Sequence, residues 1–226
     1  MTLPELIHKL WDACAELLYP RSCFGCGARG PYICERCRTA MRPQSYRLNN
    51  GMAIFAAFPY HHAGIRRAIK QLKYRGSRDI AASLARIIAA SLPADVKTSG
   101  AEIVAIPATA HRERARGFNQ SKLLGQALAQ HLNCAFTDAL IKIRETPPQS
   151  PLMRAERLKN LQSAFATRET YAPRPSEARP VASEGGPLPA VIIVDDVSTT
   201  GATLLEAARV LKIAGATKII GAVVAH

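Results

Sequence analysis

The stretch from Ala190 to Thr203 reads AVIIVDDVSTTGAT, and it decides the fold class of the chain. Its first five residues are apolar, a pattern typical of a strand that is buried on both faces of a parallel sheet. Two acidic residues, Asp195 and Asp196, end this run, and a short loop rich in hydroxyl groups leads into a helical pattern that starts at Ala202. The N–H groups of such a loop and the positive end of the helix dipole converge on one point. We therefore predict an α/β fold with an anion site at the carboxyl end of this strand.

The two carboxylates narrow the kind of anion that the loop would accept. A site for phosphate alone would gain nothing from adjacent negative charges, whereas carboxylates accept strong hydrogen bonds from the vicinal hydroxyl groups of a ribose. The stretch therefore matches a ribose 5-phosphate. The alternative is a buried strand capped by a turn rich in aspartate. The candidate phosphate residues are Val197, Ser198, Thr199, Thr200, Gly201, Ala202 and Thr203.

Composition limits the partners and the compartment. The 226 residues suffice for one full domain and a small appendage, and the formal net charge is +13. This excess favours anionic partners such as phosphates, nucleic acids or acidic proteins without choosing among them. The opening residues include acids and no cleavage site for a signal peptide, and no apolar run is long enough to span a bilayer. We expect a cytoplasmic protein without membrane insertion.

Four of the six cysteines form two Cys-x-x-Cys pairs, which seven residues separate. In a reducing compartment such pairs indicate metal ligands before disulfides, and four thiolates suit a structural Zn²⁺ in a closed tetrahedral site. A redox dithiol and a chance pairing are the alternatives. We predict a small zinc-ribbon-like module over residues 21–41, after an amphipathic helix over residues 1–20. The predicted ligands are Cys23, Cys26, Cys34 and Cys37.

Basic residues gather on one predicted helix. We interpret residues 42–51 as a linker, residues 52–60 as a strand and residues 61–74 as a helix whose polar positions are almost all basic. This basic stretch is either a solvated helix face or a surface that binds DNA or another anion, and the pattern favours neither. The candidate DNA- or anion-binding residues are Arg66, Arg67, Lys70, Lys73 and Arg75, with Arg112 from a later segment.

A second buried strand, predicted over residues 102–107, ends in another candidate site. Ligands in open α/β sheets bind at the carboxyl ends of the strands. Arg112, Arg114 and Arg116 follow at alternating positions, which suits a flexible loop that closes over a polyanion, because a guanidinium group binds two phosphate oxygens at once. Further strands are predicted over residues 140–143 and 218–225. The proline-rich residues 166–189 predict an insertion exposed to solvent.

The stretch from Asp195 to Thr203 resembles the signature of type I phosphoribosyltransferases, which bind phosphoribosyl pyrophosphate (PRPP). The resemblance implies that the acid pair holds the 2′ and 3′ hydroxyls of the ribose and that the following loop holds the 5′-phosphate. It also implies that the turn after the second strand binds the pyrophosphate, and that Mg²⁺ binds with PRPP. The residues of that turn are Pro107, Ala108 and Thr109, and the implied catalytic residues are Asp195, Asp196, Arg114 and Arg116.

The resemblance extends to nearly the whole chain. The paired cysteines, the segment 73–76 (KYRG) and the run 114–120 (RARGFNQ) join the acid-pair stretch in resembling the ComF family. Members of that family join an N-terminal zinc module to a phosphoribosyltransferase-like domain, here residues 52–226. The resemblance implies a role in natural competence, namely the handling of incoming single-stranded DNA, together with competence or recombination proteins. It also implies a hood over the site, built from Thr146, Gln149, Arg154, Arg157 and Asn160.

Three functions compete at this point. A competence protein would bind PRPP and handle single-stranded DNA through basic grooves and stacking aromatics, although aromatics make up only 6% of the chain. An active phosphoribosyltransferase of nucleotide metabolism would transfer the ribosyl group to an acceptor and release pyrophosphate. A PRPP-sensing scaffold would bind without turnover. Because the sequence shows no acceptor pocket, we favour the competence protein, with the enzyme as the alternative. Whether turnover occurs stays open.

Overall fold

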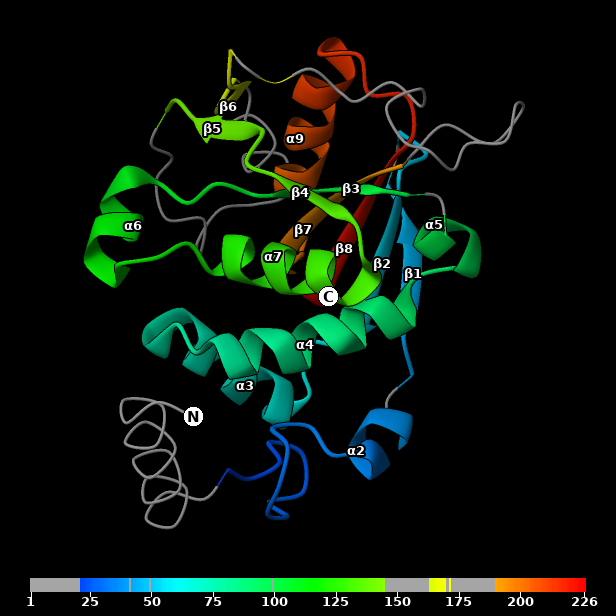
Figure 1. Cartoon of the computed structure of the whole chain (residues 1–226), viewed down its shortest axis with the longest axis vertical. Coiled ribbons are helices and arrows are strands. Elements are labelled where there is room, and N and C mark those ends of the chain that lie inside the picture. Colours follow the sequence, from blue (N-terminus) through cyan, green and yellow to red (C-terminus); the bar gives the residue numbers. More distant parts are fainter. Residues whose placement is uncertain are drawn as a thin grey trace, which may run out of the picture.

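A computed structural model describes residues 21–40, 42–48, 50–98, 100–144, 163–169, 171 and 190–226 (Figure 1). The helix predicted over residues 1–20, the hood residues and residues 172–189 of the predicted insertion lie outside the described residues. The helices are α2 (Glu35–Ala40), α3 (Ala63–Arg75), α4 (Arg78–Ser91), α5 (Ala94–Thr98), α6 (Ala110–Arg116), α7 (Gln120–Leu132) and α9 (Ala202–Ile213). None of the helices in this described part is both long and apolar enough to cross a membrane.

A mixed sheet forms the centre of the molecule. Its strands lie in the order β1-β2-β8-β7-β3-β4, and every neighbouring pair is parallel except β1 and β2. A separate antiparallel ribbon consists of β5 and β6. The strands are β1 (Gln44–Arg47), β2 (Ala53–Phe58), β3 (Glu102–Ala105), β4 (Ala135–Thr137), β5 (Leu140–Lys142), β6 (Phe165–Thr167), β7 (Val191–Val197) and β8 (Ile219–Ala225). The predicted α/β class with a parallel sheet is confirmed.

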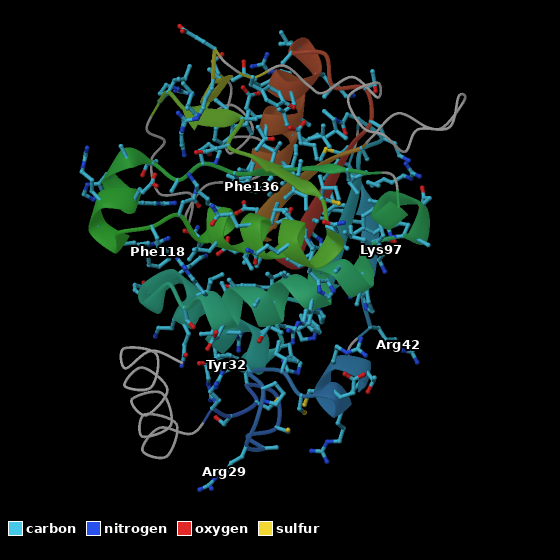
Figure 2. All side chains as sticks on the ribbon, viewed as in Figure 1. Arg29, Tyr32, Arg42, Lys97, Phe118 and Phe136 are labelled. Carbon is cyan, nitrogen blue, oxygen red and sulfur yellow. The ribbon has the colours of Figure 1, made fainter. Side chains whose placement is uncertain are left out.

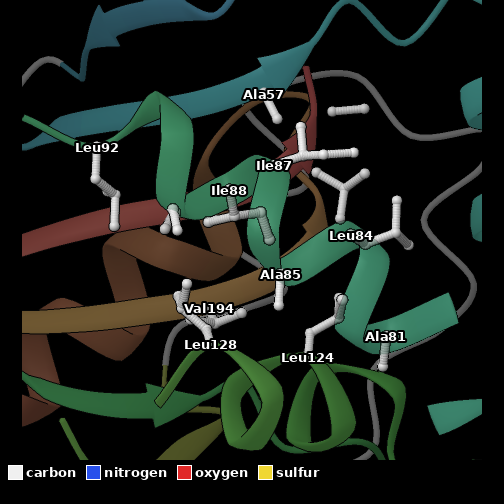
Figure 3. Packing of buried hydrophobic residues seen from close by; sticks show 14 of the residues in the cluster. Ala57, Ala81, Leu84, Ala85, Ile87, Ile88, Leu92, Leu124, Leu128 and Val194 are labelled. Carbon is white, nitrogen blue, oxygen red and sulfur yellow. The ribbon is translucent and has the colours of Figure 1, made fainter. Parts of the chain in front are cut away.

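Helices cover both faces of this sheet, which explains why the central strands are continuous apolar runs. In β7, Ile192 and Val194 pack into a core beneath α3, α4 and α7. Val191 and Ile193 pack into a second core, which α9 and the β5–β6 ribbon complete. Figure 3 shows part of the first core, where Leu84 and Ile88 of α4 face the side of α7 that carries Leu124 and Leu128.

The cysteine module lies against the first layer of helices. Phe24 stacks on Tyr32, with 5.3 Å between the ring centroids, and Phe24 also joins the core of α3 and α4. The contact with α3 is close, because a Cβ atom at Gly64 would lie 2.4 Å from the carbonyl oxygen of Phe24. Figure 1 shows the module on the helices α3 and α4, away from the sheet.

Two segments differ from the sequence-based expectation. The predicted linker over residues 42–51 contains β1, which extends the sheet beyond β2 in antiparallel register. The predicted flexible loop around the arginines is the helix α6, which Thr109 begins by accepting a hydrogen bond from the N–H of Arg112 (3.2 Å) and Gly117 ends with a positive φ. Local capping therefore orders a segment whose charges alone suggested mobility.

The predicted insertion over residues 166–189 begins later than expected. Ala166 and Thr167 belong to β6 and pair with β5. Beyond this strand, Arg168 donates a hydrogen bond to the carbonyl oxygen of Asp138 (2.9 Å), and the hydroxyl of Tyr171 donates to Glu102 (3.3 Å). These bonds anchor the start of the segment to β3 and to the turn between β4 and β5.

Candidate functional site

The site lies where two neighbouring strands send their chains to opposite faces of the sheet. After β3 the chain passes through α6 to α7 on one face, and after β7 it enters α9 on the other. Such a switch point leaves a crevice at the carboxyl ends of the strands. A pocket of about 190 Å³ occupies it. We call residues 107–109 the β3 turn and residues 198–203 the β7 loop. All three residues of the turn line the pocket, whereas Thr203 is the one predicted phosphate residue among 197–203 that belongs to its lining.

The acid pair lies at the floor of this pocket. Ser121 of α7 donates a hydrogen bond to Oδ1 of Asp195 (2.7 Å), and Lys73 of α3 places its Nζ 2.6 Å from Oδ2 of Asp196. Burial and then the negative charge of Asp196 raise the pKa of Asp195 to about 7. The structure thus brings two carboxylates together at a cost that Lys73 and Ser121 only partly offset.

Cationic side chains surround the rest of the pocket. The lining contains Lys73, Arg112, Arg116 and Lys142. Arg116 also donates a hydrogen bond to the side-chain oxygen of Gln120 (3.0 Å). Four cations beside two carboxylates suit a ligand with several phosphate charges and a hydroxyl-bearing sugar.

The structure sorts the predicted basic residues differently from the sequence. Arg112 and Lys73, which we predicted to bind DNA or another anion, line the pocket, whereas Arg114, which the resemblance assigned to catalysis, is not part of the lining. Arg66, Arg67 and Lys70 are exposed on α3. Arg75 ends α3, and its side chain lies outside the described part.

Sequence analysis missed several residues of the site. Lys142 and Phe165 come from the β5–β6 ribbon, and Gln120 and Ser121 come from the first turn of α7. The alternation of the strand at residues 140–143 places Lys142 opposite its apolar neighbours, which is a usable signal. No sequence signal pointed to Ser121, because its hydrogen bond to Asp195 joins segments that lie far apart in the chain.

A glycine shapes the backbone of the β7 loop. Gly201 has a φ of +75° at the N-cap of α9, and Thr200 accepts a hydrogen bond from the N–H of Ala202 (3.4 Å). A side chain at position 201 would collide with Leu48, whose Cδ2 atom would lie 2.4 Å from the new Cβ. Only glycine fits both the conformation and the space.

Two of the sequence motifs meet beside the pocket. Gly76 closes α3 with a φ of +58°, and a Cβ there would lie 2.6 Å from the ring of Phe118. Figure 2 shows Phe118 between α6 and the layer of α3 and α4. The packing of this ring on Gly76 joins the 73–76 motif to the 114–120 motif, so the helix that carries Lys73 is positioned against the helix that carries Arg116.

The four paired cysteines form a candidate metal centre. Their Sγ atoms all lie within 4.8 Å of one another. Although burial alone would raise the pKa of Cys23, N–H groups of Cys34, Cys26 and Gly25 lower it to about 6. Burial and the neighbouring thiols raise the pKa of Cys37 to about 12. The thiols compete for negative charge, which a divalent cation would relieve, and the set of four sulfurs fits Zn²⁺.

Comparison with known proteins agrees with the fold. Residues 119–226 match the phosphoribosyl transferase domain, so this part of the chain is a domain of that class. The chain is 34% identical over 156 residues to the DNA utilization protein YhgH of Salmonella typhimurium and 33% identical over 156 residues to that of Escherichia coli K12. It is 31% identical over 118 residues to Competence protein F of Haemophilus influenzae.

The chain belongs to the ComF family, as its motifs predicted. The matched segment covers 67% of this chain and 62% of each of the two YhgH proteins. For Competence protein F the shares are 52% and 46%. The chain therefore spans about 62% or less of the length of these relatives.

Proposed function

We propose that the pocket binds PRPP together with Mg²⁺, and that the protein serves natural competence by handling single-stranded DNA. The observation that carries the proposal is the meeting of three features in one cavity: the acid pair, Thr203 at the end of the β7 loop and four cationic side chains. The acid pair would accept the ribose hydroxyls, and the N–H groups of the loop would hold the 5′-phosphate. Mg²⁺ would supply positive charge between the carboxylates and the pyrophosphate.

The pyrophosphate end would lie toward α6. Arg112 and Arg116 are four residues apart on this helix, so their side chains share the face that lines the pocket. Lys142 approaches from the ribbon. We expect these three side chains, in place of Arg114, to bind the pyrophosphate oxygens.

Binding of PRPP is tested by Asp195→Asn and Asp196→Asn. Each should weaken PRPP binding, measured by calorimetry, by about 1.5–3 kcal/mol, the value typical of a hydrogen bond to a charged group. Asp95→Asn is the matched control, because Asp95 is exposed and pairs with Lys218 away from the pocket. Unchanged PRPP affinity in both pocket variants would overturn this assignment.

The proposed DNA surface is the exposed face of α3. Arg66, Lys70 and Tyr74 follow one another at intervals of four residues and are exposed, Tyr74 by 71%. Basic side chains track a phosphate backbone, and an exposed aromatic ring at the end of the row can stack on a base. The relatives' names, a DNA utilization protein and a competence protein, support a DNA-related role.

The DNA surface is tested with matched single-charge variants. Arg66→Gln and Lys70→Gln should each lower the slope of log affinity against log salt by about 0.7, because one fewer counterion is released from the single strand. Tyr74→Ala should weaken binding by about 1–3 kcal/mol through lost stacking. Lys212→Gln on α9 removes the same charge elsewhere and should leave the slope unchanged. Equal effects of all the charge variants would show only nonspecific attraction.

One observation favours catalysis as the second candidate function. A carboxyl group whose pKa is raised to about 7 can accept a proton from an acceptor substrate near neutral pH. As an active phosphoribosyltransferase, the protein would form a bond between the acceptor and C1 of the ribose while the bond to pyrophosphate breaks. Release of pyrophosphate from PRPP in the presence of candidate acceptors, absent in Asp195→Asn, is the measurement that decides between binding and turnover.

A further inference from the structure

Three side chains outside the pocket hold the β7 loop from behind. The hydroxyl of Tyr46 in β1 donates a hydrogen bond to the Oγ atom of Ser198 (2.8 Å), and the Nδ1 atom of His226 lies 2.8 Å from the carbonyl oxygen of Ser198. The two rings stack on each other, with 4.0 Å between their centroids. Leu48, two residues after Tyr46 in the chain, packs against Gly201. The loop is therefore held at its first residue and at its glycine.

The chemistry of these bonds fixes the orientation of Ser198. A carbonyl oxygen only accepts, so Nδ1 of His226 must carry a proton and donate it. The N–H of Ser198 donates to the carbonyl oxygen of Ala225 (3.0 Å), so the backbone and the side chain of this buried serine are all engaged. Burial raises the pKa of Tyr46, which keeps its phenol protonated and able to donate.

We propose that Tyr46, Leu48 and His226 are positioning residues that hold the β7 loop in the conformation that accepts the 5′-phosphate of the sugar. None of them lines the pocket. They contact Ser198 and Gly201, and Thr203 of the same loop belongs to the lining. A loop that is ordered before the ligand arrives loses less entropy on binding, so loosening it reduces affinity for the phosphate end alone. This inference rests on the proposed function, because it assigns the 5′-phosphate to the β7 loop.

The test compares the binding of two fragments of PRPP, ribose 5-phosphate and pyrophosphate, by the whole 226-residue chain. Ribose 5-phosphate would contact the β7 loop, whereas pyrophosphate would bind near α6. Tyr46→Phe, which keeps the ring stack, should weaken ribose 5-phosphate binding by about three- to tenfold, the loss expected for one hydrogen bond, and leave pyrophosphate binding unchanged. Leu48→Ala should have the same selectivity. Ser198→Ala combined with Tyr46→Phe should be no worse than Ser198→Ala alone, because both act on one bond.

Tyr171→Phe is the matched control. It removes another half-buried tyrosine hydroxyl, which donates to Glu102 in β3 rather than to the loop. It should change the thermal midpoint by a similar amount without affecting either ligand.

If Tyr46→Phe leaves ribose 5-phosphate affinity unchanged, or weakens both ligands equally, the positioning role is wrong while the pocket assignment stands. If the unmodified protein binds neither fragment nor PRPP, the proposed function itself fails and this inference fails with it.

Discussion

Replacing Lys73 with methionine tests the ion pair on which the acid pair depends. The side chain of Asp196 is only 7% exposed, and its Oδ2 atom contacts the ammonium group of Lys73 at 2.6 Å. The other oxygen, Oδ1, accepts a hydrogen bond from the N–H of Val197 (2.9 Å). Methionine keeps much of the length and volume of lysine and removes the charge, so Asp196 would remain buried beside Asp195 without its cation.

The expected cost follows from the exposure of the two partners. Breaking a fully buried pair costs about 3–5 kcal/mol. The ammonium side chain is 29% exposed, so solvent already screens part of the attraction, and we expect Lys73→Met to lower the free energy of unfolding by roughly 1.5–3 kcal/mol at pH 7.

The sign of the pH dependence is fixed by linkage. Removing the charge of Lys73, which lowers the pKa of Asp195, would leave that carboxyl group with a pKa still further above its unfolded value. Below the unfolded pKa both states are protonated and the variant loses little, and the loss grows as the pH rises toward neutrality. Urea denaturation at pH 5 and pH 8, followed by circular dichroism, measures this difference.

Two variants control the experiment. Lys70→Met lies one turn earlier on the exposed face of α3 and should change stability by less than about 0.5 kcal/mol at either pH. The double variant Lys73→Met/Asp196→Asn removes the unpaired charge and should recover most of the lost stability. A Lys73→Met loss that is equal at both pH values, or that persists in the double variant, would refute the reasoning.

Three further outcomes are expected. Purified protein should contain one zinc ion per chain by elemental analysis, and Cys23→Ser or Cys37→Ser should lose it and expose residues 21–40 to protease; an unchanged zinc content would contradict the assignment. Gly76→Ala should lower the thermal midpoint more than Gly117→Ala, since both glycines have positive φ but only the first would clash with Phe118, and equal shifts would be evidence against that packing. Because the pKa of Asp195 rises from 3.8 to about 7 on folding, the unfolding free energy relative to Asp195→Asn should fall as the pH rises from about 4 to 7, and parallel stability curves would exclude a shifted carboxyl group.

The apolar runs, and the polar residues that end them, were enough to predict the central strands and the position of the acid pair. The run before Asp195 has no polar residue to face solvent, so it could only be a strand covered on both sides. The loop after this run contains three hydroxyl-bearing residues and a glycine in succession. These features are local, which is why the sequence predicts them.

The positions of the basic side chains depend on secondary structure and on contacts between distant segments, which the pattern of charges along the sequence does not reveal. We read the arginines as a loop, where alternate residues share a side, whereas in the helix α6 Arg112 and Arg116 share a face and Arg114 does not. The N-cap Thr109 and the C-terminal Gly117 are the signals that would have predicted this helix. The pairing of Lys73 with Asp196 joins remote segments, and a charge run on one helix cannot reveal it.

The strand β1 makes the boundary between module and domain different from the one that composition suggests. A fragment starting at Met52 would lack the edge strand and would leave the outer backbone groups of β2 without their antiparallel partners. An exposed parallel edge of this kind invites pairing between copies of the chain. Dissection of the protein should therefore keep residues from Arg42 onward, and a fragment that begins at Met52 is expected to associate with itself rather than report on the isolated domain.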